Sequence, residues 1–123
     1  MPKTPLEKMF LKPNYSAAFL HVPNSIKDHI KTSNKIDKEI KGKYDFILAF
    51  YTQKEKLQHE INKIKHSLET NGILWIGYPK GKALETDLNR DILHSLLQEN
   101  NLDGVSIISL NDIWSVMRFK LLD

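Results

Sequence analysis

The sequence contains no cysteine, only five glycines and no long hydrophobic run. Without cysteine, disulfide bonds, thiolate catalysis and the common structural zinc and iron–sulfur sites are excluded. No apolar stretch approaches the roughly 20 residues that a membrane-spanning helix requires, and the N-terminus lacks the apolar middle section of a secretion signal. We therefore expect a cytoplasmic protein that does not associate with a membrane. Any catalysis would have to rely on oxygen or nitrogen groups.

The length of 123 residues is that of one domain, which can bury roughly two thirds of the surface that its unfolded chain exposes. We treat residues 1–123 as a single domain. Residues 1–12 are expected to be a loosely docked N-terminal segment, because Pro2 and Pro5 precede only a short apolar patch.

The formal net charge of +3 is concentrated in one segment. Six lysines lie between Lys27 and Lys43, against three acidic residues. A solvated lysine-rich face is the simpler interpretation. Nucleic-acid binding is not expected, because neither arginines nor interleaved aromatic residues accompany these lysines.

The clearest structural signal is the stretch 71–98, NGILWIGYPKGKALETDLNRDILHSLLQ. A continuous apolar run over 73–78 predicts a strand buried on both faces. A basic loop follows, and then a helix with Leu88, Ile92, Leu96 and Leu97 on one face, for which Thr86 or Asp87 could cap the N-terminus. Strand, loop and helix in this order form half of a βαβ unit.

The other segments continue the alternation of strand and helix. Strands are predicted over 15–22, 44–50, 105–110 and 114–121, with a weak edge strand within 32–43. A helix capped by Asn24 or Ser25 should follow the first strand. A second helix should start at a capping box of Thr52 and Glu55, carry Leu57, Ile61, Ile64 and Leu68 on one face, and end near 71–72. The short connection between the last two strands makes them an antiparallel pair. The predicted fold class is α/β, a three-layer sandwich with a minimal Rossmann-like, mostly parallel sheet that ends in an antiparallel hairpin.

Four pieces of the sequence together carry a family resemblance, YDFILAFYT, WIGYPKG, TDLNRD and DIWSVMRF. On these pieces the chain resembles, from Phe10 to Lys120, a small bacterial family of proteins with a domain of unknown function. That family is similar to the core of class I methyltransferases. The resemblance implies a strand order of 2-1-4-5-7-6 in the methyltransferase scheme, with an antiparallel seventh strand.

The turn after the first strand departs from the methyltransferase pattern. Such proteins place glycines there, so that the backbone can approach the cofactor, and an acidic residue after the second strand to hold the ribose hydroxyls. Here the turn is His21-Val22-Pro23-Asn24-Ser25, without glycine, and the second strand offers Asp37 or Glu39. We therefore expect that S-adenosylmethionine binding has been lost and that the protein has no cofactor.

Ligands of open α/β sheets bind beyond the carboxyl ends of the parallel strands. This rule predicts a site on one rim of the sheet, formed by eight residues from three strand ends: His21, Asn24, Thr52, Gln53, Lys80, Lys82, Thr86 and Asn89. Two lysines near the positive end of a helix dipole favour a small anion. The alternative is that Thr86 caps its helix and both lysines are solvated.

Two further features have both structural and functional interpretations. His21 could act as a general base, but without a nucleophile in a recognisable motif it is better explained as a hydrogen-bonded structural residue, and no metal site is expected from the histidine spacing. Trp114 and Arg118 share one face of the last strand, where Arg118 could stack on the indole, pair with Asp112 or Asp87, or contact an acidic ligand or protein partner.

The sequence thus favours a non-catalytic Rossmann-like domain that binds a small anionic ligand, a protein partner or a second copy of itself. The alternative function is that of a degenerate or atypical S-adenosylmethionine-dependent methyltransferase.

Overall fold

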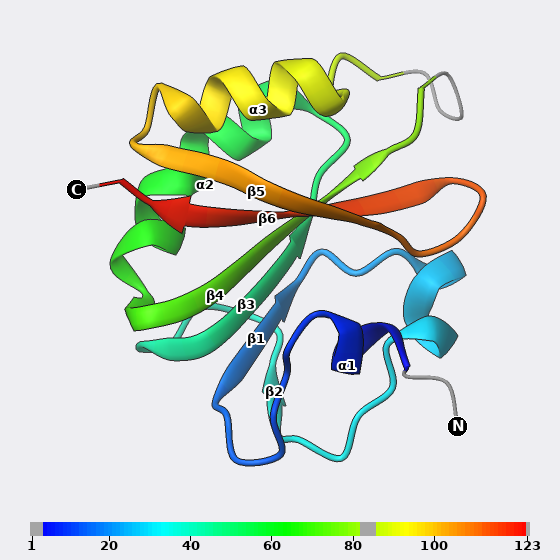
Figure 1. Cartoon of the computed structure of the whole chain (residues 1–123), viewed down its shortest axis with the longest axis vertical. Helices are drawn as coiled ribbons and strands as arrows, with labels where there is room; N and C mark the ends of the chain where they lie inside the picture. The colour runs from blue at the N-terminus through cyan, green and yellow to red at the C-terminus, as the bar shows by residue number, and fades with distance from the viewer. Residues whose placement is uncertain (1–3, 82–85, 123) are drawn as a thin grey trace.

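The computed structural model describes residues 4–81 and 86–122. Within them, six strands form one twisted sheet with helices on both faces (Figure 1). The strands are β1 (Ala17–Leu20), β2 (Ile36–Asp37), β3 (Tyr44–Phe50), β4 (Leu68–Pro79), β5 (Leu102–Ser109) and β6 (Trp114–Leu121). The helices are α1 (Pro5–Lys8), the 3-10 helix η1 (Asn24–His29), α2 (Lys54–His66) and α3 (Arg90–Gln98). The predicted fold class is confirmed.

The strand order is β2-β1-β3-β4-β6-β5. The first four strands in this order are parallel, and β6 is antiparallel to both of its neighbours. This is the order that the methyltransferase resemblance implied. The chain passes from β1 outward to β2 and then returns to the other side of β1 for β3, so the order reverses between β1 and β3. The carboxyl ends of β1, β3 and β4 lie along one edge of the sheet, as expected for parallel neighbours.

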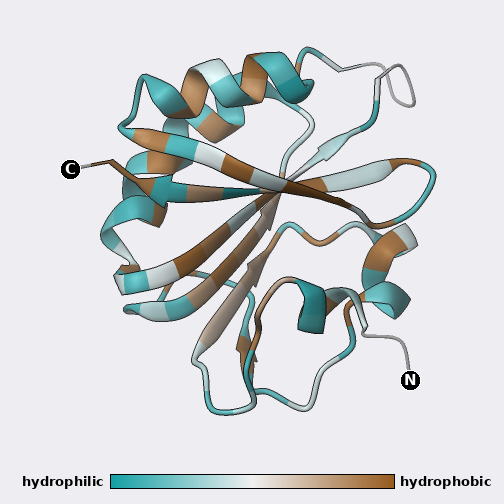
Figure 2. Cartoon of the chain, viewed as in Figure 1, coloured by the Kyte–Doolittle hydropathy of each residue, from teal (hydrophilic) through white to brown (hydrophobic). Residues whose placement is uncertain are grey.

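Both faces of the central strands are buried, which explains why these strands are continuous apolar runs. On one face, Ile47, Ala49, Leu74 and Ile76 pack against the apolar sides of α2 and α3. On the other face, a second cluster includes Phe46, Leu48, Trp75 and Val116, and α1 and η1 cover it with Leu6, Met9, Ile26 and Ile30. Figure 2 shows the hydrophobic residues concentrated along the strands and on the inward side of α3.

The N-terminal segment is attached to the second cluster from Thr4 onward. Thr4 and Glu7 form a capping box at the start of α1. Met9 is fully buried, and its carbonyl oxygen accepts a hydrogen bond of 3.0 Å from the indole Nε1–H of Trp75. A four-residue helix is marginal alone, so this burial and the indole bond hold it in place.

The boundary between α2 and β4 differs from the prediction. Leu68, expected on the helix face, is the first residue of β4 and pairs with Tyr44, because α2 ends at His66. The chain then bulges before rejoining β3, and Asn71 takes a left-handed φ of 64°. The Asn-Gly signal thus marks a distortion inside a strand and not the end of a helix.

The predicted capping box at the start of α2 is wrong. The N-cap residue is Gln53, and its side chain makes no capping hydrogen bond. The carboxylate of Asp87 takes this role from another loop, because its Oδ1 accepts a hydrogen bond of 2.8 Å from the Lys54 N–H. Sequence spacing cannot detect a cap that comes from 33 residues away.

The predicted cap of α3 is also wrong. Asn89 is the N-cap residue, and its side-chain oxygen accepts from the Ile92 N–H at 2.9 Å. The Thr86 hydroxyl instead accepts from the Leu88 N–H at 3.2 Å and closes a local turn before the helix.

The segment after β1 is less regular than expected. It forms the 3-10 helix η1, which starts after Pro23 without a side-chain cap from Asn24 or Ser25. The weak edge strand within 32–43 is confirmed, but only Ile36 and Asp37 pair with β1. Neither segment forms a long helix over the carboxyl end of β1. This end of the strand is therefore uncovered and borders a cavity.

Candidate functional site

The turn that follows β1 has the backbone conformation that glycine usually provides. His21, the first residue after β1, has a φ of 56°, in the left-handed region. This conformation costs a non-glycine residue about 1–2 kcal/mol, although histidine adopts it more often than most residues. The chain therefore keeps the geometry of a glycine turn at the reversal point of the sheet, although its sequence there contains no glycine.

The side chain of His21 joins a hydrogen-bonded network between β1, the end of β3 and α2. Its Nε2 lies 2.8 Å from Glu60 Oε1, which also accepts a 2.6 Å hydrogen bond from the Tyr51 hydroxyl. The Lys56 ammonium lies 3.5 Å from His21 Nδ1, and the His21 and Tyr51 rings meet edge to face at 5.4 Å. One tautomer, protonated at Nε2, satisfies both ring contacts at once.

Protonation in this network follows from its geometry. Partial burial acts to raise the pKa of Glu60, but hydrogen bonds from Tyr51 and His21 and the nearby Lys56 outweigh it and lower that pKa overall. Burial, and then the contact with Glu60, raise the pKa of the Tyr51 phenol well above its ordinary value. At neutral pH the network thus contains a carboxylate and a neutral phenol. Because both nitrogens of His21 are engaged, the structure supports the interpretation of His21 as a hydrogen-bonded structural residue.

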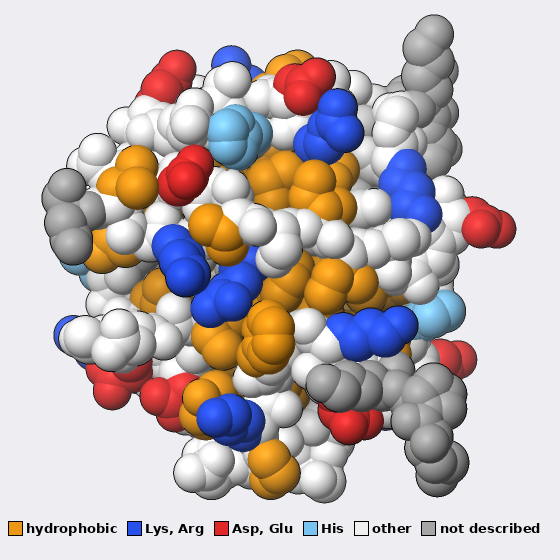
Figure 3. Space-filling view, viewed as in Figure 1, with side chains coloured by type: hydrophobic (Ala, Val, Ile, Leu, Met, Phe, Trp, Pro, Cys, Tyr) orange, Lys and Arg blue, Asp and Glu red, His pale blue; other side chains and the backbone are white. Residues whose placement is uncertain are grey.

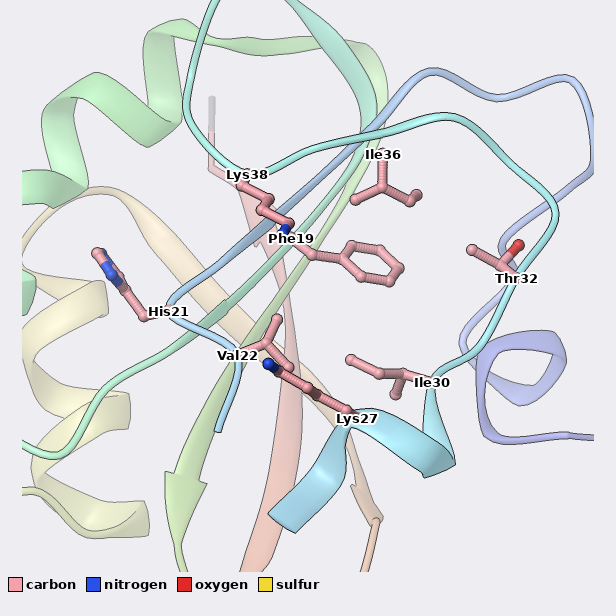
Figure 4. A pocket seen from close by; sticks show the side chains of 8 residues that line it. All are labelled: Phe19, His21, Val22, Lys27, Ile30, Thr32, Ile36 and Lys38. Atoms are coloured by element: carbon pink, nitrogen blue, oxygen red, sulfur yellow. The ribbon is translucent and has the colours of Figure 1, made fainter. Parts of the chain in front are cut away.

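A cavity of about 420 Å³ lies beside this turn, between β1, β2 and η1. Figure 4 shows Lys27 of η1 and Lys38, which follows β2, reaching toward the same space from opposite sides. The His21 ring is turned away from them, toward α2. Eight residues line the cavity: Phe19, His21, Val22, Lys27, Ile30, Thr32, Ile36 and Lys38.

A second hollow, of about 360 Å³, lies between the start of α2 and the loop that precedes α3. It brings together three predicted site residues, Thr52, Gln53 and Thr86, with two carboxylates, those of Glu55 and Asp87. The position at the start of α2 where an anion would bind is therefore already held by the carboxylate of Asp87.

The remaining predicted rim residues are placed differently. The Lys80 ammonium donates a hydrogen bond to the Ser109 hydroxyl, so it points to β5 and away from this hollow. Asn89 is occupied as the cap of α3. Asn24 is exposed at the start of η1. Lys82 lies outside the described residues, so anion binding by this loop stays a prediction.

Four residues of the site were not selected from the sequence, namely Lys27, Lys38, Tyr51 and Glu60. The two lysines belong to the lysine-rich segment that was interpreted as a solvated face. Their convergence depends on η1 and β2 flanking the same cavity, and the sequence pattern indicated both elements only weakly. Glu60 is one of several charged residues of α2, and only its position next to Tyr51 distinguishes it.

Trp114 and Arg118 share a face of β6, as predicted, but their contacts differ from the expected ones. Trp114 is 4% exposed and packs edge to face on Phe50, with ring centroids 5.5 Å apart. The Arg118 guanidinium lies 5.2 Å from the centroid of the Phe10 ring. The expected stacking on Trp114 or pairing with Asp112 or Asp87 is therefore wrong. The N-terminal segment supplies the partner, which the sequence did not reveal.

Neither a metal-binding cluster nor a membrane-spanning helix is present in the described part of the chain. No group of three or more histidine, aspartate or glutamate side chains there could hold a metal ion. No helix in residues 4–81 or 86–122 is both long and apolar enough to cross a membrane.

Several solved structures match this chain over most of its length. The ribosomal protein L11 methylase from Lactobacillus delbrueckii subsp. bulgaricus matches 96% of this chain and 75% of its own, with a TM-score of 0.60 and 13% identity. The glycopeptide N-methyltransferase MtfA matches 94% of this chain and 87% of its own, with a TM-score of 0.59 and 6% identity. This is a methyltransferase-like fold.

A complex of DhpI with SAH has the same methyltransferase-like fold, with a TM-score of 0.56, 7% identity and coverage of 87% of this chain and 66% of DhpI. At these identities the likeness concerns the fold alone. No family model matches the sequence, and no curated protein matches it. The resemblance to a small bacterial family therefore stays a prediction.

Proposed function

We propose that this chain is an atypical S-adenosylmethionine-dependent methyltransferase, which would hold its cofactor at the carboxyl edge of the sheet where the strand order reverses between β1 and β3. The observation that carries the proposal is the left-handed turn at His21, directly after β1. In open α/β sheets this reversal is where the ligand crevice lies. The strand order and the methyltransferase-like fold support the same location.

The residues at this edge fit such a ligand in part. The backbone of residues 21–24 would approach it, although Pro23 has no amide to donate. Thr52 and Gln53 follow β3, are exposed, and offer polar side chains. The acid expected after the second strand, Asp37, accepts a 2.6 Å hydrogen bond from the Tyr44 hydroxyl with its Oδ2. Only its other oxygen would remain for the ribose hydroxyls.

When bound, S-adenosylmethionine supplies a methyl group activated by a positive sulfur. The chain's own contribution would be binding and orientation. Because Glu60 remains ionised in its network, it would place a negative charge near the cationic ligand. The contacts of the His21 ring with Glu60 and Lys56 would hold the turn in its left-handed form.

The test is calorimetric titration of the protein with S-adenosylmethionine and with its demethylated product. We expect micromolar binding of both. Thr52→Arg should abolish it, because a bulky cation would enter the edge of the crevice. The control is Thr70→Arg, the same substitution at an exposed threonine in the bulge of β4, at the opposite end of the sheet. Absence of binding at millimolar ligand, or equal loss in both variants, would contradict the proposal.

A further inference from the structure

We infer that the 420 Å³ cavity between β1, β2 and η1 binds a small phosphate monoester with a flat apolar body, such as a nucleoside monophosphate. The inference goes beyond the proposed methyl transfer and does not rest on it. The cavity lies on the β2 side of β1, beside the connection from β1 to β2 that contains η1 (Figure 4).

The charge of the cavity favours an anion. Two lysines, Lys27 and Lys38, line it, and none of the eight lining residues is acidic. The acids next to these lysines in the sequence, Asp28, Asp37 and Glu39, do not line the cavity. Asp28 pairs with Lys31 at 3.4 Å, and Asp37 accepts from Tyr44. The two ammonium groups thus face the space without a carboxylate between them.

The walls of the cavity favour an apolar body. Phe19, Val22, Ile30 and Ile36 supply its apolar surface. Phe19 and Ile30 are 6% and 5% exposed and belong to the core cluster on this face, so packing holds their side chains in place. A largely apolar pocket with a few polar groups is the usual form of a small-molecule site, and its volume lies within the ordinary range of about 300–1,000 Å³.

The two features together define the ligand class. A phosphate monoester carries nearly two negative charges at neutral pH, which matches two lysines. A base or other aromatic ring can lie along the Phe19 wall. Inorganic phosphate would use the lysines alone, and a nucleoside would use the walls alone. Both should therefore bind more weakly than a molecule that joins the two parts.

The experiment measures the binding of adenosine 5′-monophosphate, adenosine and inorganic phosphate by calorimetry. Charge-assisted hydrogen bonds are each worth roughly tenfold or more in affinity. We therefore expect the monophosphate to bind at least tenfold more tightly than either fragment. The double variant Lys27→Gln and Lys38→Gln should reduce its affinity to that of adenosine.

The matched control is Lys35→Gln with Lys41→Gln, which removes the same charge from exposed lysines of the same segment that do not line the cavity. It should keep the affinity within about twofold. Equal affinities for the monophosphate and adenosine, equal losses in the two double variants, or no binding at millimolar concentration would each overturn the inference. Because S-adenosylmethionine binding is measured separately, its failure leaves this result unaffected.

Discussion

The carboxylate of Asp87 is expected to stabilise the domain as the cap of a helix to which it does not belong. Its Oδ1 accepts a hydrogen bond from the Lys54 N–H, in the first turn of α2. Losing an N-cap acceptor costs about 0.5–2 kcal/mol. Losing a negative charge at a helix N-terminus costs about 0.3–1 kcal/mol more at an exposed site. For Asp87→Ala we therefore expect the free energy of unfolding to fall by about 1–2 kcal/mol.

Two further variants separate the parts of this effect. Asp87→Asn keeps a side-chain oxygen and removes the charge, so it should cost only about 0.3–1 kcal/mol, and its difference from the parent should shrink at high salt. Thr52→Ala removes the residue that the sequence pattern nominates as the cap. Because Thr52 makes no capping hydrogen bond, this change should cost less than about 0.5 kcal/mol.

Urea unfolding followed by circular dichroism measures all three variants. For a domain of this size, 1 kcal/mol corresponds to a shift of about 3–6 °C in melting temperature. The reasoning is refuted if Thr52→Ala destabilises the protein as much as Asp87→Ala does. That result would mean that α2 is capped locally, as the capping-box pattern predicts.

Two other changes test the core and the network at the end of β1. Gly77→Ala should destabilise the fold by about 1–3 kcal/mol in urea unfolding, because a Cβ would lie 2.3 Å from Phe50 Cδ2. Gly42→Ala, which would meet no atom within 4 Å, is its control, and equal effects would contradict this explanation. For Glu60, whose pKa is lowered by its hydrogen bonds, the stabilisation is present above the ordinary pKa of about 4.5 and is lost as the pH falls through the lowered value. The advantage of the parent over Glu60→Gln should therefore be constant above about pH 4.5 and shrink as the pH falls below it, and an advantage that does not shrink in acid would contradict this explanation.

One face of the molecule also carries exposed hydrophobic side chains. Figure 3 shows them gathered in the middle of the face on which β5 and β6 lie. Over the whole described part of the chain, the exposed large hydrophobic residues are Phe10, Val105, Ile107, Leu121 and Leu122. Binding of a protein partner or a second copy of the chain stays a prediction, which light scattering would test.

The order of elements followed from local patterns. The runs over 44–50 and 73–78 predicted the central strands because a strand buried on both faces has few polar positions; Asp45 is the one charged residue in them. The boundaries of β6 were predicted correctly because the short connection through Asn111 and Asp112 forces a hairpin. The sheet order came from the family resemblance and could not be obtained from the residues themselves.

The sequence by itself determined the fold class and the strand ends that lie at one edge, because periodicity and turn residues act over a few neighbouring positions. The tertiary structure alone decided that Asp87 caps α2, that Lys80 points to Ser109, that Arg118 packs on Phe10, and that Lys27 and Lys38 share a cavity. Each of these contacts joins residues that are distant in the chain or on separate elements. The pairing of these side chains depends on how the sheet twists and how its loops pack, and local sequence patterns contain no information about either.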